Sequence, residues 1–178
     1  MEVPIPKLEV RISANQLHKG ALEVVRAIRP DWPESELNYK IFTDGITNRL
    51  IGVYKNGDVH ELILIRVYGE NTDLFIDRNL ELRNMRAMHK AGLSAPIYCT
   101  FTNGICYGFT PGKVLDKVSI RKPNIFVLIA ENMARMHTLK PKCSGRFNQD
   151  SYACLFPGLK KFLALIINAP PLKDTFER

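Results

Sequence analysis

One charged side chain lies inside an otherwise apolar segment of the sequence. Arg66 interrupts residues 62–67, Leu-Ile-Leu-Ile-Arg-Val, whose composition is typical of a buried β-strand. Burying a cation is costly unless it meets an anion, so Arg66 needs a partner. Glu81 lies one turn into a segment with helical periodicity and could be that partner. The residues alone leave a second interpretation open, in which Arg66 extends its guanidinium from the strand end to water.

Generic phosphate and metal motifs do not occur in the sequence. There is no G-x-G-x-x-G segment, and residues 108–114 are one residue short of a P-loop and end in Val where Ser or Thr must meet magnesium. The four cysteines form no C-x-x-C pair, and the four histidines have no close Cys or His neighbour at ligand spacing. We therefore expect no metal-ligating residues, no disulfide scaffold, and reduced cysteines that fill core or surface positions.

Apolar periodicity and turn residues predict the elements that position Arg66 and Glu81. We expect helices over residues 15–28, 77–90, 124–138 and 159–168, and strands over residues 39–42, 49–54, 62–68, 97–102 and 105–109. Asn56-Gly57 and Asn103-Gly104 predict hairpin turns, because both residue types tolerate positive φ.

Capping residues predict where the helices start and stop. Ser13 or Asn15 could cap the first helix, Asp77 is expected to cap the second, and Gly92 to end it in a left-handed conformation. The helix over residues 124–138 is apolar on most sides near its start, which predicts that it is buried.

Size and composition are typical of a folded globular protein. The chain has 178 residues, 46% of them hydrophobic and 24% charged, which suits one domain or two small lobes. No apolar run approaches the roughly 20 residues of a membrane span, and no secretory signal is visible, so we expect a cytoplasmic protein. The net charge of +7 permits nucleic acid, anionic lipid or a phosphorylated ligand, but Lys/Arg runs never exceed two residues, which argues against a nucleic-acid arm.

The order of hairpin, third strand, helix, hairpin, connector and helix resembles the small lobe of a protein-kinase-like fold. In that fold, a loop between the first two strands covers nucleotide phosphates, a basic residue on the third strand reaches them, and a glutamate on the following helix holds it. We predict an α+β fold: a protein-kinase-like N-terminal lobe of antiparallel sheet plus helix, with the start of an incomplete helical C-terminal lobe. The expected divisions are a helical segment 1–36, a nucleotide-binding small lobe 37–113 and the beginning of a truncated large lobe 114–178.

Several short segments resemble the choline/ethanolamine kinase family. They are residues 43–48 (T-D-G-I-T-N), 65–69 (I-R-V-Y-G), 96–101 (P-I-Y-C-T-F), 103–109 (N-G-I-C-Y-G-F) and 129–137 (I-A-E-N-M-A-R-M-H). Each alone is a weak signal, but their order over residues 39–138 is specific. The first and fourth segments resemble the ethanolamine branch more than the choline branch.

The resemblance implies an ATP site. A loop over the phosphates would donate backbone N–H groups, and it would consist of Asp44, Gly45, Ile46, Thr47 and Asn48. Arg66 would contact the phosphates and Glu81 would hold Arg66. A hinge along the adenine edge would consist of Tyr107, Gly108, Phe109, Thr110 and Pro111. Plainer interpretations stay open: Asp44-Gly45 as a simple turn, and Tyr107 and Phe109 as strand-core aromatics.

Two catalytic segments of the family do not occur in the sequence. One is H-N-D-L-x-x-x-N, which supplies the base and a metal-binding Asn; the other is I-D-Y-E-Y, whose Asp holds magnesium. His137 is followed by Thr-Leu, and Asp150 has no preceding His. We therefore predict the N-terminal portion of an ethanolamine kinase, which would use ATP and Mg²⁺ to make phosphoethanolamine, the first step towards phosphatidylethanolamine. The chain would hold no catalytic residue and would not turn over alone, and the metal ligands would lie in a missing C-terminal lobe.

Other functions are also compatible with the sequence. The chain could be a truncated, non-catalytic isoform that binds nucleotide, forms a homo-oligomer or modulates a full-length kinase. Residues 159–167 are apolar with two lysines, and could be an exposed partner-binding surface or a membrane-surface helix. A basic nucleic-acid binder rests on net charge alone and lacks a recognisable module.

Overall fold

A computed structural model of the chain describes residues 4–42, 48–74, 76–139 and 155–168. The described strands form one six-stranded sheet, in the order β1-β5-β6-β4-β3-β2. Their bounds are β1 (Lys7–Leu8), β2 (Leu37–Phe42), β3 (Arg49–Lys55), β4 (Ile63–Val67), β5 (Ile97–Phe101) and β6 (Gly104–Gly108). All neighbours pair antiparallel except β1 and β5, which are parallel. The predicted kinase-like sheet is therefore present, with a parallel edge strand that was not predicted.

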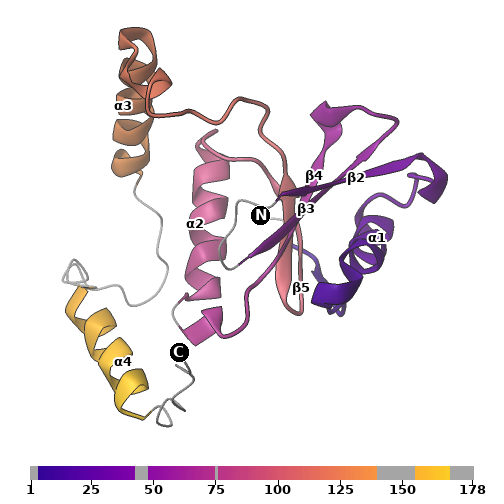
Figure 1. Cartoon of the computed structure of the whole chain (residues 1–178), viewed down its shortest axis with the longest axis horizontal. Helices are drawn as coiled ribbons and strands as arrows, with labels where there is room; N and C mark the ends of the chain where they lie inside the picture. The colour runs from indigo at the N-terminus through magenta and orange to yellow at the C-terminus, as the bar shows by residue number, and fades with distance from the viewer. Residues whose placement is uncertain (1–3, 43–47, 75, 140–154, 169–178) are drawn as a thin grey trace, which may run out of the picture. The chain divides into compact units, whose positions relative to one another are not determined.

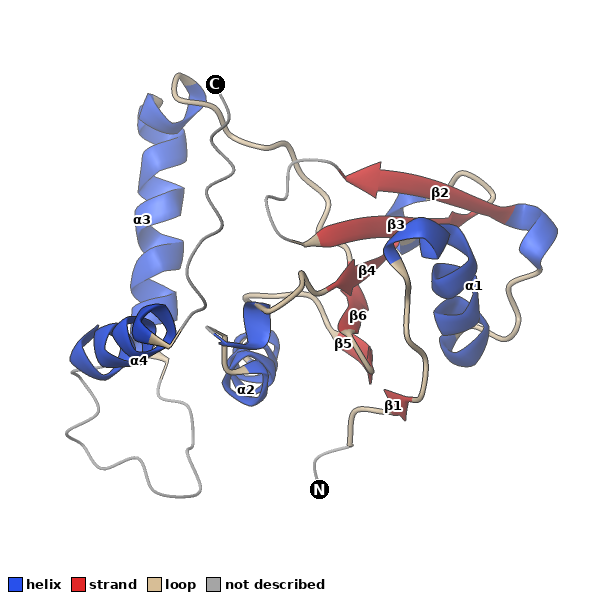
Figure 2. Ribbon diagram, turned by 60° about the horizontal axis from the view of Figure 1, so that its bottom comes forward, coloured by secondary structure: helices blue, strands red, loops and turns tan. Residues whose placement is uncertain are grey.

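Four α-helices lie in the described residues. Their bounds are α1 (Leu17–Ile28), α2 (Arg78–Lys90), α3 (Pro123–Thr138) and α4 (Leu155–Ile167). Short 3₁₀ turns are Ala14–Gln16, Glu34–Glu36, Val59–Glu61, Thr72–Leu74 and Ser119–Arg121. The helices α1 and α2 lie on opposite sides of the sheet (Figures 1 and 2). The chain divides into two compact units, residues 1–140 and 141–178, and the second contributes α4; the predicted divisions after residues 36 and 113 stay a prediction.

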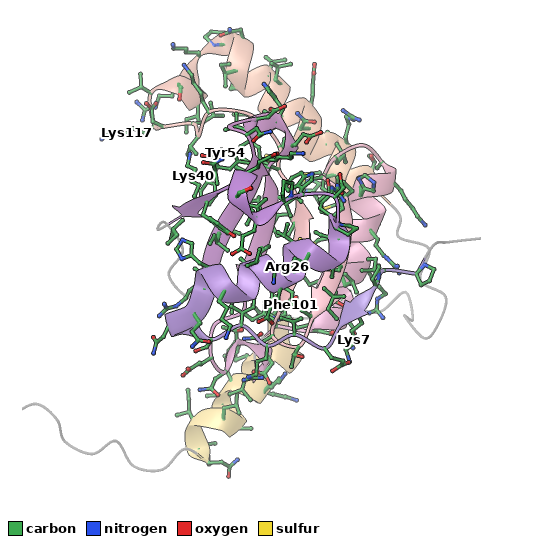
Figure 3. All side chains as sticks on the ribbon, turned by 90° about the vertical axis from the view of Figure 1, so that its right-hand side faces the viewer. Lys7, Arg26, Lys40, Tyr54, Phe101 and Lys117 are labelled. Atoms are coloured by element: carbon green, nitrogen blue, oxygen red, sulfur yellow. The ribbon has the colours of Figure 1, made fainter. Side chains whose placement is uncertain are left out.

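The hydrophobic core lies between α1 and one face of the sheet. Strand alternation explains it, since every second residue of β4 points to this face. The buried cluster comprises Ile12, Leu17, Ala21, Val24, Val25, Trp32, Ile51, Val53, Ile63, Ile65, Val67, Cys99, Phe101 and Cys106. Viewed from the α1 side, the helix lies across the sheet with the exposed Arg26 on its outer surface (Figure 3). The N-terminal segment thus supplies one wall of the core.

Two of the cysteines pair across strands inside this core. Cys99 on β5 lies opposite Cys106 on β6, and both are free and fully buried. Burial raises the pKa of the Cys106 thiol well above its usual value. These two residues therefore act as small apolar side chains, as predicted, while Cys143 and Cys154 lie outside the described residues.

The two Asn-Gly pairs behave differently. Asn56 and Gly57 both have positive φ (49° and 77°), and Asp58 N donates to Lys55 O at 2.9 Å, which confirms the first predicted turn. At the second hairpin the prediction was wrong about the turn residues. Gly104 begins β6 and pairs with Phe101, so the turn residues are Thr102 and Asn103, and neither has positive φ.

Two other local expectations need correction. The 3₁₀ turn before α1 follows Ser13, but neither end of that turn nor the start of α1 carries a side-chain cap, so Ser13 and Asn15 do not cap. The predicted burial of the helix at residues 124–138 was also wrong: α3 has no buried residue, because no described element within residues 4–139 covers its apolar sides. The caps predicted for α2 are both present, as Asp77 accepts from two backbone N–H groups and Gly92 has a φ of 71°.

Candidate functional site: an arginine–glutamate cluster beside the sheet

Arg66 lies on the face of the sheet opposite α1. Its neighbours Ile65 and Val67 point into the core, so the period-two alternation of β4 places Arg66 on the other side. It pairs in register with Leu50 on β3 and Ile105 on β6, near the middle of the sheet. Only 21% of its side chain is exposed. A cation at this position has lost much of its contact with water and needs a counter-charge.

Glu81 on α2 supplies that counter-charge. Asp77 starts the helix by accepting from the N–H groups of Asn79 and Leu80, and this cap fixes the first turn that carries Glu81. Arg66 Nη2 donates to Glu81 Oε1 at 2.7 Å. The predicted ion pair is therefore present, and the alternative, in which Arg66 only reaches water, does not hold.

A second arginine, which sequence reasoning missed, binds the same carboxylate. Arg78 Nη1 donates to Glu81 Oε2 at 2.9 Å, three residues away on α2. The i, i+3 spacing of opposite charges on one helix was the signal that could have found this contact. Arg78 also stacks over the Tyr68 ring at 3.8 Å from its centroid and donates to the Thr72 hydroxyl.

The cluster carries more positive than negative charge. Arg66 and Arg78 share the single carboxylate of Glu81, so the three side chains together have a charge of about +1 at neutral pH. The Nε atoms of both arginines are buried and have no hydrogen-bond partner among the described residues, and the same is true of Asn48 Oδ1. Buried donors without partners, beside excess positive charge, favour an anionic ligand.

Two tyrosines line the same face. The Arg66 guanidinium carbon lies 5.6 Å from the centre of the Tyr68 ring and 5.8 Å from that of Tyr107, within cation–π range. Burial raises the pKa of both phenols, and the Glu81 carboxylate adds to the rise, whereas the Arg66 guanidinium opposes it. Tyr107 is therefore part of the polar face, half-buried, and does not belong to the core cluster under α1.

The residues predicted as a hinge span the end of β6: Tyr107 and Gly108 are its last two residues, and Phe109, Thr110 and Pro111 follow it. Gly108 N donates to Pro96 O at 2.8 Å, and Phe109 N donates to Leu62 O at 3.1 Å. These two N–H groups are therefore occupied within the protein and are not available to a ligand. Phe109 is partly buried, whereas Thr110 and Pro111 are exposed.

Not every predicted site residue can be placed. Asp44, Gly45, Ile46 and Thr47 lie outside the described residues, and of the predicted phosphate loop only Asn48 is described, partly buried before β3. Among the described residues, no group of His, Cys, Asp or Glu side chains could hold a metal ion. The described helices also include none that is long and apolar enough to cross a membrane.

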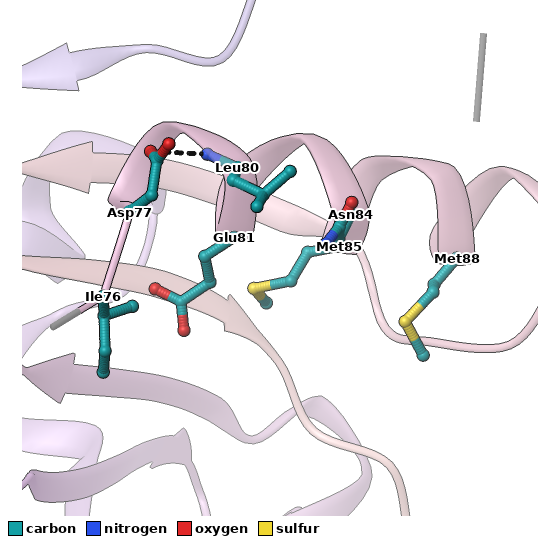
Figure 4. Close-up of a pocket in the computed structure, with 7 residues that line it drawn as sticks. All are labelled: Ile76, Asp77, Leu80, Glu81, Asn84, Met85 and Met88. Atoms are coloured by element: carbon teal, nitrogen blue, oxygen red, sulfur yellow. Dashed lines mark hydrogen bonds between the residues drawn. The ribbon is translucent and has the colours of Figure 1, made fainter. Parts of the chain in front are cut away.

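A shallow hollow adjoins the cluster along α2. It has a volume of about 410 Å³ and, besides Glu81, is lined mainly by apolar side chains (Figure 4). The lining residues are Ile76, Asp77, Leu80, Glu81, Asn84, Met85 and Met88. The Glu81 carboxylate turns away from the helix axis beside Ile76 and Met85, as Figure 4 shows.

Strand order, the Arg66–Glu81 pair and the β5–β6 hairpin define the small lobe of a protein-kinase-like fold. The solved structure of Plasmodium vivax ethanolamine kinase is similar, with a TM-score of 0.57 and 28% identity; the match covers 85% of this chain and 39% of that one. The fold class predicted from the sequence is thereby confirmed.

Sequence comparison identifies the family. The choline/ethanolamine kinase family matches residues 39–176. Human ethanolamine kinase 1 is 36% identical over 162 residues, which cover 86% of this chain and 36% of the human protein. Mouse ethanolamine kinase 2 is 40% identical over 135 residues, covering 76% of this chain and 35% of the mouse protein. The chain belongs to the choline/ethanolamine kinase family, as its motifs predicted, and spans little more than a third of the length of these curated relatives.

Proposed function

We propose that this chain is the N-terminal, nucleotide-binding portion of an ethanolamine kinase. The observation that carries the proposal is the Arg66–Glu81 pair, in which a largely buried guanidinium is held in place on the face of the sheet opposite α1. Arg66 would contact the phosphates of ATP, because its Nε donor is buried without a partner. The loop of residues 44–48 would cover those phosphates with backbone N–H groups.

The adenine ring would lie along the segment that follows β6. Since the N–H groups of Gly108 and Phe109 are already used, the base would be met by backbone carbonyls of this segment or by the N–H of Thr110. Tyr107 would form part of the floor between base and phosphates, since it lies on the same face as Arg66. Mg²⁺ would arrive with the nucleotide; the described residues include no group of His, Cys, Asp or Glu side chains that could hold it.

Calorimetric titration of Mg²⁺–ATP into the 178-residue chain tests this proposal. We expect measurable binding, and we expect Arg66→Ala to weaken it at least about tenfold, because a charge-assisted hydrogen bond to phosphate is lost. Arg83→Gln is the matched control, since Arg83 is exposed on α2. Absence of binding by the folded wild-type chain, or equal affinity of Arg66→Ala, would contradict the proposal.

Chemistry on ethanolamine would require more than this chain contains. The sequence has no segment like H-N-D-L-x-x-x-N or I-D-Y-E-Y, so neither the base nor the metal-binding residues of the family are present. We expect the complete protein to act in the cytoplasm and to make phosphoethanolamine for phosphatidylethanolamine synthesis. We expect this chain alone to make no phosphoethanolamine from ATP and ethanolamine. Turnover by the purified chain would overturn that expectation.

A second candidate function is supported by the exposed apolar side chains of α3. Phe126, Leu128 and Met133 are each at least half exposed, which is unusual for a folded chain without a partner. The chain could pair with a full-length ethanolamine kinase, or with itself, and modulate it. Co-purification of a full-length kinase with the tagged chain, lost in a Phe126→Gln, Leu128→Gln variant, would support this function, and a monomeric chain that retains no kinase would exclude it.

A further inference from the structure

We propose that Arg78 is a positioning residue of the nucleotide site, acting on phosphate through Glu81 and Arg66. The proposal rests on the proposed function, because the anion that Arg66 meets is taken to be a nucleotide phosphate. Both terminal nitrogens of Arg78 already donate to Glu81 and the Thr72 hydroxyl, so the proposal assigns Arg78 to positioning and not to direct contact with the phosphate. It holds the carboxylate that holds the phosphate-binding arginine.

The geometry of Glu81 shows how this works. Its Oε1 accepts from Arg66 at 2.7 Å and its Oε2 accepts from Arg78 at 2.9 Å. A carboxylate bound through one oxygen is free to turn about its terminal torsion, which is broad and weakly restrained. Binding of the second oxygen by Arg78 removes that freedom. Because both oxygens of Glu81 are bound, its carboxylate keeps one orientation, and this orientation fixes the direction of the Arg66 guanidinium.

Arg78 is itself anchored to the segment between β4 and α2. Its Nη2 donates to the Thr72 hydroxyl, and Thr72 Oγ1 in turn donates to Gly69 O at 2.8 Å. The guanidinium stacks on Tyr68, the residue that follows β4. Only 19% of the Arg78 side chain is exposed, and Thr72 is the buried polar residue of this segment. Arg78 thus ties the end of β4 to the first turn of α2.

Arg78 also keeps the cluster positively charged. With Arg78 present, two guanidiniums share one carboxylate; without it, Arg66 and Glu81 would form a neutral pair. A neutral pair attracts phosphate less strongly than a cluster of charge +1. Loss of the positioning contact and loss of the positive charge would therefore both weaken phosphate binding. Two different substitutions of Arg78 separate these two causes.

The first test compares variants of the 178-residue chain in Mg²⁺–ATP calorimetry. Arg78→Gln removes both the positive charge and the guanidinium that binds Glu81 and Thr72 together, and we expect about tenfold weaker binding of Mg²⁺–ATP. Arg78→Lys keeps the charge but cannot bind Glu81, Thr72 and Tyr68 together, so we expect only partial rescue, to about threefold weaker binding. Thr72→Val keeps the volume and removes the anchor, with an expected loss of about twofold. Arg83→Gln, an equal loss of charge on the same helix, is the control.

A second test does not depend on nucleotide. The side-chain ¹⁵N NMR signals of Arg66, assigned with Arg66→Lys, report whether rotation of its guanidinium is slowed by the ion pair. We expect slowed rotation in the wild-type chain and in Arg83→Gln, and faster rotation in Arg78→Gln. A purely structural role of Arg78 would lower the thermal midpoint without changing this signal in the folded protein.

The two tests separate the inference from the proposed function. If the wild-type chain binds no Mg²⁺–ATP, the proposed function fails, and unchanged Arg66 rotation in Arg78→Gln would show that the positioning role fails as well. If the wild-type chain binds, equal affinity of Arg78→Gln and Arg83→Gln overturns the positioning role alone. Weaker binding by Arg78→Gln together with faster rotation of Arg66 supports it.

Discussion

The two faces of the sheet differ in what their side chains meet. On the face under α1, Ile65 is fully buried within the apolar cluster of the core. On the opposite face, the very next residue, Arg66, lies among tyrosines and a shared carboxylate and keeps part of its side chain exposed. A single strand therefore contributes to stability with one set of alternate residues and to the candidate site with the other. The comparison predicts that substitutions on the two faces change different measured quantities.

The largest effect is expected on the α1 face. Ile65→Ala removes a fully buried side chain, and we expect a loss of about 2–5 kcal/mol in the free energy of unfolding. Denaturant unfolding of the 178-residue chain measures it. Mg²⁺–ATP affinity of the protein that remains folded should not change, because Ile65 points away from Arg66. A large loss of affinity at unchanged stability would show that the two faces are not separate.

The next effect concerns the segment that leads into α1. Asn103 accepts from Ile12 N at 3.0 Å and donates to Ile12 O at 2.9 Å, so it tethers this segment to the β5–β6 turn. Asn103→Ala leaves two backbone groups without partners, and we expect a loss of about 1–3 kcal/mol of stability. Hydrogen exchange at the Ile12 amide should accelerate. Thr102→Ala, an exposed change in the same turn, should leave that exchange unaltered.

A smaller effect is expected at the start of α2. Asp77→Ala removes the cap of the helix that carries Glu81, and we expect a loss of about 1 kcal/mol of stability. Asp73→Ala, nearby but outside the cap, is the control, with a change below about 0.5 kcal/mol. Equal losses in thermal unfolding of the two variants would mean that the cap does not fix this helix.

The smallest effect depends on pH. Folding raises the pKa of Tyr68 above its ordinary value of 10.0, chiefly through burial. The unfolded chain therefore loses the phenolic proton first, and stability falls as pH rises above about 10. We expect Tyr68→Phe to lose less stability than the wild-type chain between pH 9 and pH 11 in denaturant titrations. An identical loss in both would show that Tyr68 is not buried as described.

Elements with a strong local pattern were predictable from the sequence. The strand β4 is an almost continuous apolar run, α1 has one apolar stripe, and Asp77 and Gly92 mark the ends of α2. The hairpin at Asn56-Gly57 followed from the backbone freedom of both residues. The Arg66–Glu81 pair followed because a charge in an apolar strand needs a partner.

Features without a local pattern could not be predicted. The strand β1 is two residues long and exists only through pairing with β5. The Asn103-Gly104 pair predicts Gly104 in a turn, whereas the structure needs this glycine for close packing: a Cβ there would lie 2.3 Å from Arg66 O. Arg78 was one of several charges on a polar helix, and only the tertiary contacts with Tyr68 and Thr72 distinguish it. The prediction that α3 is buried was wrong, because the apolar residues of a helix do not show whether another element is present to cover them.

The most direct test of the account is an Mg²⁺–ATP titration of the ¹⁵N-labelled chain, followed by amide NMR. We predict shifts concentrated at Asn48, on β4 around Arg66 and at residues 107–110, with little change in α1 or its contacts. Such a result would place the nucleotide on the face opposite the core. Shifts centred on α1, or no shifts in a folded chain at millimolar nucleotide, would contradict the central claim that this face is a phosphate site.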